Sequence, residues 1–399
     1  MAQGSRGRVK DTDEDTIWEI SPHTAAKHHI LRRYLEAWAP ILLQSYNSTG
    51  VLYIDGFAGP GEYMGKERGS PIIALDSIMN HVRKSNFKGT IRFVFIEQRE
   101  DRSRHLKEVI ESKYPKLPEG ISCKVKQGEF NQIIKEVIDK ADMKGINLPP
   151  CFCFVDPFGW RDLNYEVLAK IMKYPKAELF ITFMAGFLNR FKESEQHRDS
   201  LSKLYSDKQI EQMSDPSISN EERPKLVLKM FIDNLKIQIN KFTQEKILDF
   251  SFSAYNGTGN LSYYLIHLTK SCKGIEVMKK AMFDVKKDGE YSFSDFGFVP
   301  GQTTLVSYFK EELWVAEAAK DVFEYFKGLF RLKSTDHAEK KLPVDLVKYK
   351  INCYTKWVYK ASILSHLESQ GKIEYKNNRK QNRKRGQFPE PGGYILFKF

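Results

Sequence analysis

Five short apolar segments, each followed by a helix-like segment, constrain the fold of this chain most strongly. They are residues 50–55, 91–96, 121–125, 151–155 and 178–183. Continuous apolar runs of this length are typical of strands buried on both faces of a parallel sheet, with helices covering those faces. The pattern predicts an α/β domain with a Rossmann-like parallel sheet and helices on both sides.

The same domain is expected to occupy residues 21–300, after a polar, flexible leader of residues 1–20. Its first helix is capped by Ser21 and begins at Pro22, because Ser favours the N-cap and Pro the first helical position. Residues 192–246 are charged and helix-like without a strand pattern. We therefore expect a helical insert there, at the ligand edge of the sheet.

Residues 301–399 follow a different pattern and predict a separate C-terminal domain. A helix is expected over 356–370, and two short apolar segments, 373–375 and 394–397, then bracket a basic loop containing Gly and Pro. Helices followed by a β-hairpin with a basic tip are the outline of a winged-helix domain.

Positive charge is concentrated in that hairpin. The chain carries 63 Lys and Arg against 51 Asp and Glu, a net charge of +12, and half of this excess lies in residues 371–399. A basic cluster attracts nucleic acid, because each phosphate it neutralises releases counterions. We predict a nucleic-acid contact at the tip, and the alternative is a solvated basic loop. The predicted contact residues are Lys376, Arg379, Lys380, Arg383, Lys384 and Arg385.

Composition excludes several classes of protein. With 41% hydrophobic and 29% charged residues the chain is globular, and no uncharged apolar run approaches the ~18–20 residues that span a bilayer. Five cysteines without a CxxC pair indicate neither a disulfide framework nor a zinc ribbon, so we expect a reducing cytoplasm. Cys151 and Cys153 share one face of an apolar strand and are interpreted as core thiols.

A glycine-rich loop follows the first strand. Glycines let a ligand press against bare backbone, and the acid at the strand end suits a cationic or amino group. The loop fits S-adenosylmethionine (SAM) better than the G-x-G-x-x-G of nicotinamide enzymes, and it lacks the Lys-Ser or Lys-Thr of a phosphate-binding loop. The alternative is an ordinary strand-to-helix turn. The predicted cofactor-binding residues are Asp55, Gly56, Phe57, Ala58, Gly59, Pro60 and Gly61.

Acidic residues also follow the next two strands. Glu97 ends the second strand, where a ribose-binding acid belongs in such a sheet. Glu129 follows the third strand and is predicted to meet the adenine amino group, with Phe130 against the adenine ring. Each could be an ordinary surface residue. Because the carboxyl ends of parallel strands surround one crevice, we expect these residues to form one SAM site.

The fourth strand ends in Asp156, Pro157, Phe158 and Gly159, which are the candidate catalytic residues. Amino-group methyltransferases carry Asp/Asn-Pro-Pro-aromatic here; the carboxylate and a backbone carbonyl accept hydrogen bonds from the target amine, and the aromatic ring stacks on the base. Phe158 replaces the second Pro, a form that resembles the Asp-Pro-Phe-Gly motif of tRNA guanine-N2 dimethyltransferases. The alternative is a tight turn with a packed aromatic ring.

His23, His28, His29 and Lys27 lie on the first predicted helix. His23 and Lys27 share a face because they are four residues apart. They are interpreted either as part of a lid over the glycine loop or as a solvated face. No acidic or cysteine partner is spaced with the histidines as a metal ligand would be, so no metal site is predicted.

Together these motifs resemble the three-Cys-motif partner proteins (the TcmP family), over most of the chain. The resemblance implies a bacterial or phage-associated class I methyltransferase fold with a C-terminal extension. It also implies a partner, a three-cysteine protein resembling radical-SAM enzymes that is encoded beside it. The resemblance rests on Pro22-His-Thr-Ala-Ala-Lys-His28, Tyr34-Leu-Glu-Ala-Trp38, residues 53–61, Gly69-Ser-Pro71, residues 95–97, 128–131 and 154–159, Asn189-Arg-Phe191, Tyr264-Leu-Ile-His267, Gly274 and residues 278–282.

Three functions compete at this stage. The first is a SAM-dependent methyltransferase acting on an amino group of a nucleic-acid base. The second is a non-methylating partner protein that keeps the fold, binds nucleic acid or SAM, and works with the three-cysteine protein; the altered Asp-Pro-Phe-Gly motif favours it. The third, a methyltransferase for a small molecule or a protein, is disfavoured by the basic hairpin. Fold alone cannot choose among them.

Overall fold

The structure is a computed structural model of the 399-residue chain. It describes residues 15–44, 50–82, 89–184, 201–256, 258–286, 292–294, 306–332, 340–377, 386–388 and 393–399. These residues form two compact units. The first contains the described residues up to 270 together with 292–294, and the second contains the described residues 271–286 and those from 306 onward.

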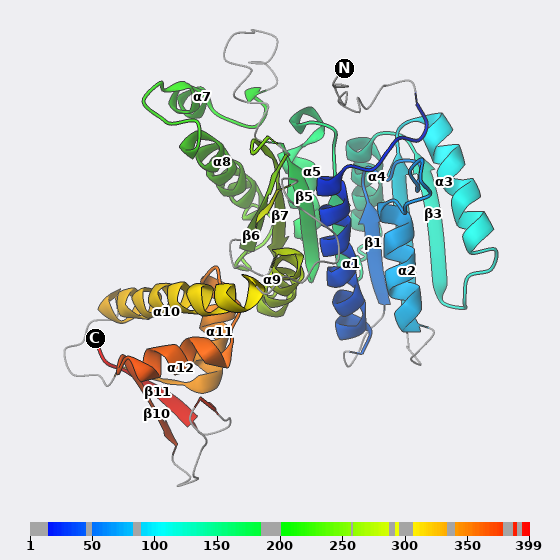
Figure 1. The fold of residues 1–399 in the computed structure, drawn as a ribbon. Helices are drawn as coiled ribbons and strands as arrows, with labels where there is room; N and C mark the ends of the chain where they lie inside the picture. The colour runs from blue at the N-terminus through cyan, green and yellow to red at the C-terminus, as the bar shows by residue number, and fades with distance from the viewer. Residues whose placement is uncertain are drawn as a thin grey trace, which may run out of the picture. The chain divides into compact units, whose positions relative to one another are not determined.

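An eight-stranded sheet forms the centre of the first unit (Figure 1). Its spatial order is β3-β2-β1-β4-β5-β7-β6-β8. Strands β1 to β5 are parallel, whereas β7 is antiparallel to both of its neighbours. This arrangement is that of the Rossmann-like class I methyltransferase fold, as predicted. The strands are β1 (Gly50–Asp55), β2 (Thr90–Glu97), β3 (Ile121–Gln127), β4 (Cys151–Val155), β5 (Ala177–Phe183), β6 (Leu248–Tyr255), β7 (Leu261–Thr269) and β8 (Ser292–Ser294).

The apolar runs that predicted the sheet correspond to its most buried strands. Strands β1, β4 and β5 are buried along their whole length. They lie in the middle of the sheet, where neighbouring strands and helices on both faces exclude water. Cys151 and Cys153 in β4 are free, fully buried thiols, as predicted.

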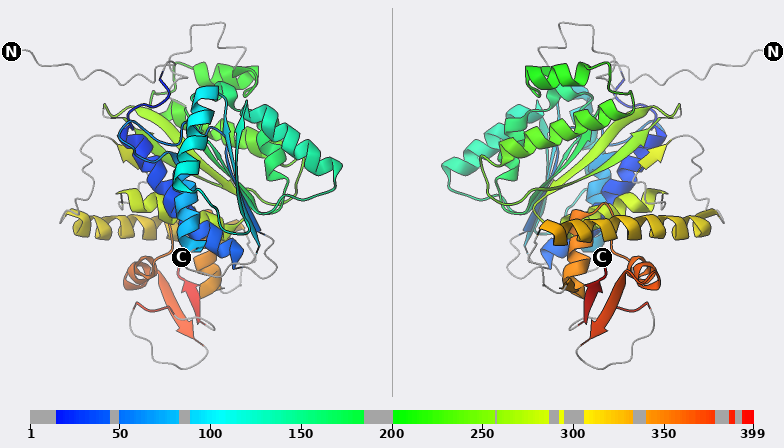
Figure 2. Two further views of the ribbon diagram at one scale, coloured as in Figure 1. Left: turned by 90° about the vertical axis from the view of Figure 1, so that its right-hand side faces the viewer. Right: turned by 90° about the vertical axis from the view of Figure 1, so that its left-hand side faces the viewer.

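Helices cover both faces of this sheet (Figures 1 and 2). One face carries α1 (Pro22–Leu43), α2 (Ser70–Val82) and α3 (Glu100–Lys113). The other face carries α4 (Phe130–Met143), α5 (Tyr165–Met172) and α8 (Glu222–Ile239), whose apolar residues share one core with β4 and β5. The described residues of this unit also form the 3₁₀ turn η1 (Trp160–Asp162) and the short helix α7 (Asp207–Ser214).

Helix α8 corrects the prediction of an insert over 192–246. Its described part, residues 201–246, is helical as expected, but α8 is a structural layer of the sheet rather than an appendage at its edge. Phe231 is fully buried and stacks on Phe183 of β5, with the ring centroids 4.4 Å apart. Most charged residues of α8 are exposed, among them Lys225, Lys229 and Asp233, whereas Arg223 is buried. The exposed charges dominate the composition of the segment and obscure its apolar stripe.

The second unit contains four helices and a small sheet among its described residues. The antiparallel sheet has the order β10-β11-β9 and packs with the helices around a core that includes Trp314 and Trp357. The hairpin of β10 and β11 confirms the two predicted apolar segments. The elements are α9 (Cys272–Lys286), α10 (Val306–Leu332), β9 (Lys341–Pro343), α11 (Val344–Tyr354), α12 (Ala361–Ser369), β10 (Ile373–Asn377) and β11 (Gly393–Phe397).

The predicted helix over 356–370 begins only at Ala361. The residues before it form a turn instead. Thr355 Oγ1 accepts a hydrogen bond from the backbone N–H of Trp357 (3.1 Å), and Trp357 Nε1 donates to Asp321 (3.0 Å). These bonds hold the chain away from helical geometry, because local side-chain acceptors compete with the helix for backbone donors.

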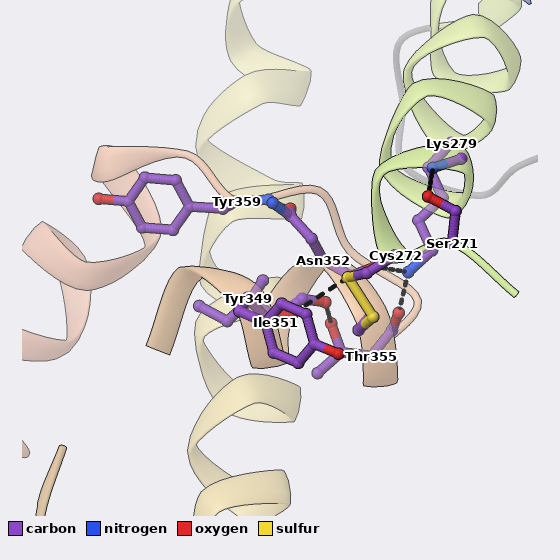
Figure 3. The surroundings of a disulfide bond; sticks show 10 residues. Ser271, Cys272, Lys279, Tyr349, Ile351, Asn352, Thr355 and Tyr359 are labelled. Atoms are coloured by element: carbon purple, nitrogen blue, oxygen red, sulfur yellow. Dashed lines mark hydrogen bonds between the residues drawn. A yellow bond between two sulfur atoms is a disulfide. The ribbon is translucent and has the colours of Figure 1, made fainter. Parts of the chain in front are cut away.

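A disulfide joins Cys272 to Cys353, which corrects the expectation that the cysteines would stay unpaired (Figure 3). The bond ties α9 to α11, and the buried Lys279 of α9 also donates to the backbone carbonyls of Asn352 and Thr355. These ties place α9 in the second unit. The division of the chain therefore falls after residue 270, earlier than the boundary at residue 300 that the sequence predicted.

Candidate active site

The glycine loop of residues 56–61 folds back over the ends of the neighbouring strands. The backbone N–H of Gly56 donates to Phe154 O of β4, and that of Ala58 donates to Ile96 O of β2, both at 2.8 Å. Gly61 has a φ of 89°, a conformation that side chains rarely allow. The loop is thus pinned between β2 and β4, at the carboxyl edge of the sheet.

Asp55 lies beneath this loop rather than at its surface. Its side chain is fully buried, and Oδ1 accepts a hydrogen bond from the N–H of Phe57 (3.3 Å). Burial raises the pKa of Asp55 to about 7, although a hydrogen bond from Ser70 works in the opposite direction. Asp55 lines neither of the two grooves described below. The direct contact with a cofactor that its place at the strand end predicted is therefore not seen in the geometry.

Glu97 at the end of β2 organises the loop. Its Oε2 accepts the N–H of Gly59 (2.8 Å), and its Oε1 accepts the N–H of Arg99 (2.9 Å). Both oxygens are therefore fixed by backbone donors, and a carboxylate keeps further lone pairs for a ligand. Glu97 lines a groove, where the sequence placed it.

This first groove has a volume of about 610 Å³. It brings together three of the predicted sites: the start of the glycine loop, Glu97, and the Glu129 turn. It also contains residues that the sequence reasoning missed. The lining residues are Gly56, Phe57, Glu97, Gln98, Arg99, Arg102, Gly128, Glu129, Phe130, Asn131, Phe158 and Asp162.

Phe130 has a different role from the one predicted. Its ring is buried and packs 5.4 Å from the ring of Phe57, and a Cβ on Gly56 would come within 2.6 Å of it. The ring therefore supports the glycine loop from below and offers little face to a ligand. Gly56 is required here because any larger residue would collide with Phe130.

Asn131 and Asp162 are polar residues of the first groove that carried no sequence signal. Asn131 Nδ2 donates to the backbone carbonyl of Asp162 (2.9 Å). Burial and the nearby Glu129 raise the pKa of Asp162. Asp162 belongs to η1, and no spacing rule predicts that this turn folds back toward the end of β3.

A second groove of about 300 Å³ lies beside the first. The two share Phe57 and Phe158, and Phe158 is 56% exposed. The walls of the second groove come from α1, the glycine loop and the end of β4. The lining residues are Trp18, Glu19, Ser21, His23, Thr24, Lys27, His28, Phe57, Ala58, Gly59, Pro60, Gly61, Glu62, Tyr63, Gly69, Ser70, Asp156, Pro157, Phe158, Met184 and Tyr263.

Three of the four candidate catalytic residues line the second groove, namely Asp156, Pro157 and Phe158. Gly159 does not; it has an extended backbone and precedes η1. Asp156 forms an ion pair with Lys27, whose Nζ lies 2.5 Å from Asp156 Oδ2. The sequence singled out Lys27 only as part of a lid, and its pairing with Asp156 was not foreseen because the two are 129 residues apart.

The histidines of α1 are also part of this wall. His28 is buried, and burial together with the adjacent Lys27 lowers its pKa to about 3 despite the opposing effect of Asp156. Its imidazole is therefore neutral at physiological pH. The hydroxyl of Tyr263 donates to the backbone carbonyl of His23 (2.7 Å), which joins β7 to the start of α1. The start of α1 thus borders the glycine loop, as the lid interpretation proposed.

Residues 15–20 belong to the expected flexible leader but lie ordered over the glycine loop. The N–H of Met64 donates to the carbonyl of Trp18 (3.0 Å), and the guanidinium of Arg102 lies 4.4 Å from the Trp18 ring. Thr16 also donates to Asp101 at the start of α3 (2.8 Å). The segment is therefore anchored to two elements, whereas residues 1–14 of the expected leader lie outside the described residues.

The predicted nucleic-acid contact lies mostly outside the part of the chain that the structure describes. Lys376 is on β10, 3.6 Å from Glu374. The other predicted contact residues fall outside the described ranges; they are Arg379, Lys380, Arg383, Lys384 and Arg385.

Two further findings concern the described residues only. They contain no cluster of three or more His, Cys, Asp or Glu side chains placed to hold a metal ion. None of their helices has the length and apolar character needed to cross a bilayer.

Comparisons with known proteins give a limited result. No protein-family model matches the chain, and no curated protein matches it. It is similar to the solved structure of Trm1 from Pyrococcus horikoshii with S-adenosyl-L-methionine, at 12% identity and a TM-score of 0.36, over 65% of this chain and 59% of that one. It is also similar to an O-methyltransferase from Bacillus cereus in complex with SAH, at 12% identity and a TM-score of 0.31, over 63% of this chain and 82% of that one. Sequence identities and TM-scores this low establish neither the substrate nor the activity of this chain.

Proposed function

We propose that the protein is a SAM-dependent methyltransferase that acts on an amino group of a nucleic-acid base. The observation that carries this proposal is the pair of adjoining grooves at the carboxyl edge of the sheet. One is lined by Glu97 and Glu129, the other by Asp156, and the exposed ring of Phe158 borders both. Open α/β sheets bind their ligands at this edge.

The first groove suits the adenosyl part of SAM. Its volume of about 610 Å³ and its three carboxylates, which line it together with two arginines, match a ligand with ribose hydroxyls and an adenine amino group, all of which donate hydrogen bonds. Glu97, Glu129 and Asp162 are the acceptors placed to receive them. When bound, SAM supplies an electrophilic methyl group; the acceptor nitrogen bonds to its carbon, the carbon–sulfur bond breaks with its electrons left on sulfur, and the nitrogen then loses a proton to water.

The second groove suits the acceptor. Asp156 can accept a hydrogen bond from an NH₂ group and so orient the nitrogen lone pair, and Phe158 offers a face on which a base can stack. A base in a duplex must be flipped out or presented single-stranded to enter such a pocket. The proposal assigns the methyl acceptor to this groove.

The second unit is proposed to bind the polymer. From α10 onward its described elements follow the order helix, strand, two helices and hairpin, which supports a winged-helix domain, and the hairpin tip is basic. The resemblance to three-Cys-motif partner proteins adds a proposed partner, a radical-SAM-like three-cysteine protein, in the cytoplasm of a bacterium or in association with a phage.

One observation favours a second candidate, a partner protein that keeps the fold without methylating. The Asp156 carboxylate already accepts a hydrogen bond from Lys27, which leaves fewer acceptor positions for a substrate. A protein of this kind would bind SAM or nucleic acid and present a substrate to its three-cysteine partner. It would show cofactor binding without methyl transfer to any polymer.

Methyl transfer to RNA and DNA tests the first proposal. The full chain is incubated with methyl-labelled SAM and total nucleic acid of both kinds, and label is counted before and after nuclease digestion. We expect label in nuclease-sensitive material and a loss of about a hundredfold or more in Asp156→Ala, because a positioned acceptor of the target amine is then lost. Label only in protein, or an unchanged rate in folded Asp156→Ala, would contradict the proposal.

A further inference from the structure

The polar face of α1 is the part of the second groove that the proposed function leaves unused. Ser21, Thr24, Lys27 and His28 recur at helical spacing, and all four line the groove. Ser21 caps the helix by accepting the N–H of Thr24. The opposite face of α1 is apolar and buried in the core; it carries Ile30, Leu31, Tyr34 and Leu35. The helix is therefore fixed against the sheet, and its first two turns present polar groups to the groove.

Lys27 is the unusual member of this face. Its side chain is only 8% exposed and that of Asp156 20%, so both charges are largely removed from water. A buried charge costs several kcal/mol unless an opposite charge meets it in good geometry. The short contact between Lys27 and Asp156 meets this condition. Each charge is therefore stabilised by the other, and either one left alone would favour a ligand of opposite charge.

An aromatic ring, a neutral imidazole and an engaged carboxylate surround Lys27, and His23 and the exposed Glu19 also line the groove. The ring of Tyr263 lies 5.4 Å from Lys27 Nζ, and the low pKa of His28 keeps that imidazole uncharged. The groove contains three carboxylates, Glu19, Glu62 and Asp156. Oε1 of Glu62 lies 3.2 Å from Nε2 of His105. The charge next to Asp156 is therefore set by Lys27.

We propose that Lys27 selects the acceptor in the second groove, admitting a neutral aromatic amine and excluding a protonated alkyl amine such as a lysine side chain. The inference rests on the proposed function and names its substrate class. A neutral NH₂ group can still donate to Asp156, because one ammonium occupies only one of about four acceptor positions of a carboxylate. A protonated amine would lie beside the Lys27 ammonium, and like charges at such distances cost several kcal/mol.

Lys27 is accordingly a positioning and specificity residue rather than a catalytic one. It holds the Asp156 carboxylate in place, and the aromatic rings of Tyr263 and Phe158 line the same groove. A nucleobase has both properties that this pocket requires, a flat ring and an uncharged exocyclic amine. This reading also explains the ion pair without assigning the protein a non-methylating role.

A ligand-binding experiment tests this selection without knowledge of the natural substrate. The probes are cytidine, a neutral aromatic amine, and n-butylammonium, a protonated alkyl amine, titrated by ligand-observed NMR into the full chain saturated with S-adenosylhomocysteine (SAH). We expect wild type to bind cytidine in preference. In Lys27→Met, affinity for n-butylammonium should rise about tenfold or more, because Asp156 then lacks its cation. In Lys27→Met/Asp156→Asn this gain should disappear.

The control is Arg33→Ala, which removes an exposed cation of α1 that pairs with Glu36 outside the groove. This variant should leave the affinity for both probes unchanged. No gain of n-butylammonium binding in folded Lys27→Met, or a gain that survives in the double variant, would overturn the proposal.

A second variant covers the case in which Lys27→Met does not fold. Asp156→Asn leaves the Lys27 ammonium as the net charge of this wall, and it should bind acetate about tenfold more tightly than wild type does; the absence of this gain would overturn the proposal. Calorimetry with SAH reports separately on the proposed function. If wild type binds SAH but the charge selectivity is absent, only the role of Lys27 is wrong.

Discussion

At the scale of single residues, chemical type and place on a strand do not distinguish Glu97 from Asp55. Both follow an apolar strand, so the sequence treats them alike. In the structure Glu97 lines the first groove and binds two loop amides, whereas Asp55 is enclosed under the loop. Whether a carboxylate at the end of a strand faces a ligand depends on how the following loop folds. The fold of the loop depends in turn on long-range contacts, such as that of Phe130 with Gly56, which residue spacing does not predict.

The buried Asp55 predicts a specific pH dependence of stability. Its pKa is raised from 3.8 to about 7, so the native state holds a proton that the unfolded state has released. Stability from this group is therefore complete below pH 4 and lost as the pH rises to about 7. A shift of about three pH units corresponds to at most about 4 kcal/mol. In Asp55→Asn this loss of stability between pH 4 and 7 should be absent.

The measurement is the free energy of unfolding by denaturant between pH 4 and 8, for wild type and Asp55→Asn. The difference between the two curves isolates Asp55 from the other titrating groups. A difference that does not change with pH would show that the carboxyl group is not enclosed as described.

At the scale of elements, the sheet and its helices followed from the sequence because each central strand reads as an apolar run. Two elements did not follow. Helix α8 was interpreted as an insert because its charged solvent face dominates its composition, and residues 15–20 were included in a flexible leader because they follow a polar N-terminal segment. In both cases a few apolar or aromatic residues, Phe231 and Trp18, hold the element in place.

Phe231→Ala tests whether α8 is a layer of the core. Removing a fully buried aromatic side chain leaves a cavity, and the expected loss is about 3–5 kcal/mol of unfolding free energy. The matched control is Ile237→Ala, an exposed apolar residue of the same helix. Denaturant unfolding of the two variants gives the comparison. Equal, small effects would mean that α8 is peripheral.

Trp18→Ala tests whether residues 15–20 retain the cofactor. Trp18 contacts Arg102 and lies next to Phe158, with ring centroids 6.4 Å apart. Loss of a cation–π contact of about 1–2 kcal/mol should speed the dissociation of SAH roughly tenfold, measured by stopped flow. Met64→Ala, which changes an exposed neighbouring side chain, is the control. Equal dissociation rates in Trp18→Ala and the control would contradict a retaining role.

At the scale of the whole molecule, the sequence predicted two units and the fold of the first. It placed the boundary too late, because α9 continues the sheet domain in sequence but is joined to α11 by the Cys272–Cys353 disulfide and by Lys279. Such ties link residues that are far apart in the chain, so they lie outside what periodicity can reveal. The polymer-binding role of the second unit rests on its charge.

The basic hairpin tip gives a prediction for nucleic-acid binding. On a single strand each phosphate contact contributes about 0.7 to the slope of log affinity against log salt, so replacing Arg383, Lys384 and Arg385 by Ala should lower the slope by up to about two units. The slope is obtained from the affinity for a fluorescent single-stranded oligonucleotide, measured between low and moderate salt. Lys229→Ala, on the exposed surface of α8, is the control, and an unaltered slope in the triple variant would rule out these residues.

Calorimetric titration with SAM and SAH tests the central claim, that the first groove binds an adenosyl cofactor, most directly. The full chain is titrated as wild type and as Glu97→Gln, which replaces the carboxylate that holds Gly59 and Arg99 by an amide. The account predicts micromolar binding of both ligands to wild type and about tenfold weaker binding to Glu97→Gln, because a charge-assisted acceptor is lost. Folded wild-type protein that binds neither ligand, or Glu97→Gln that binds both as tightly as wild type, would contradict it.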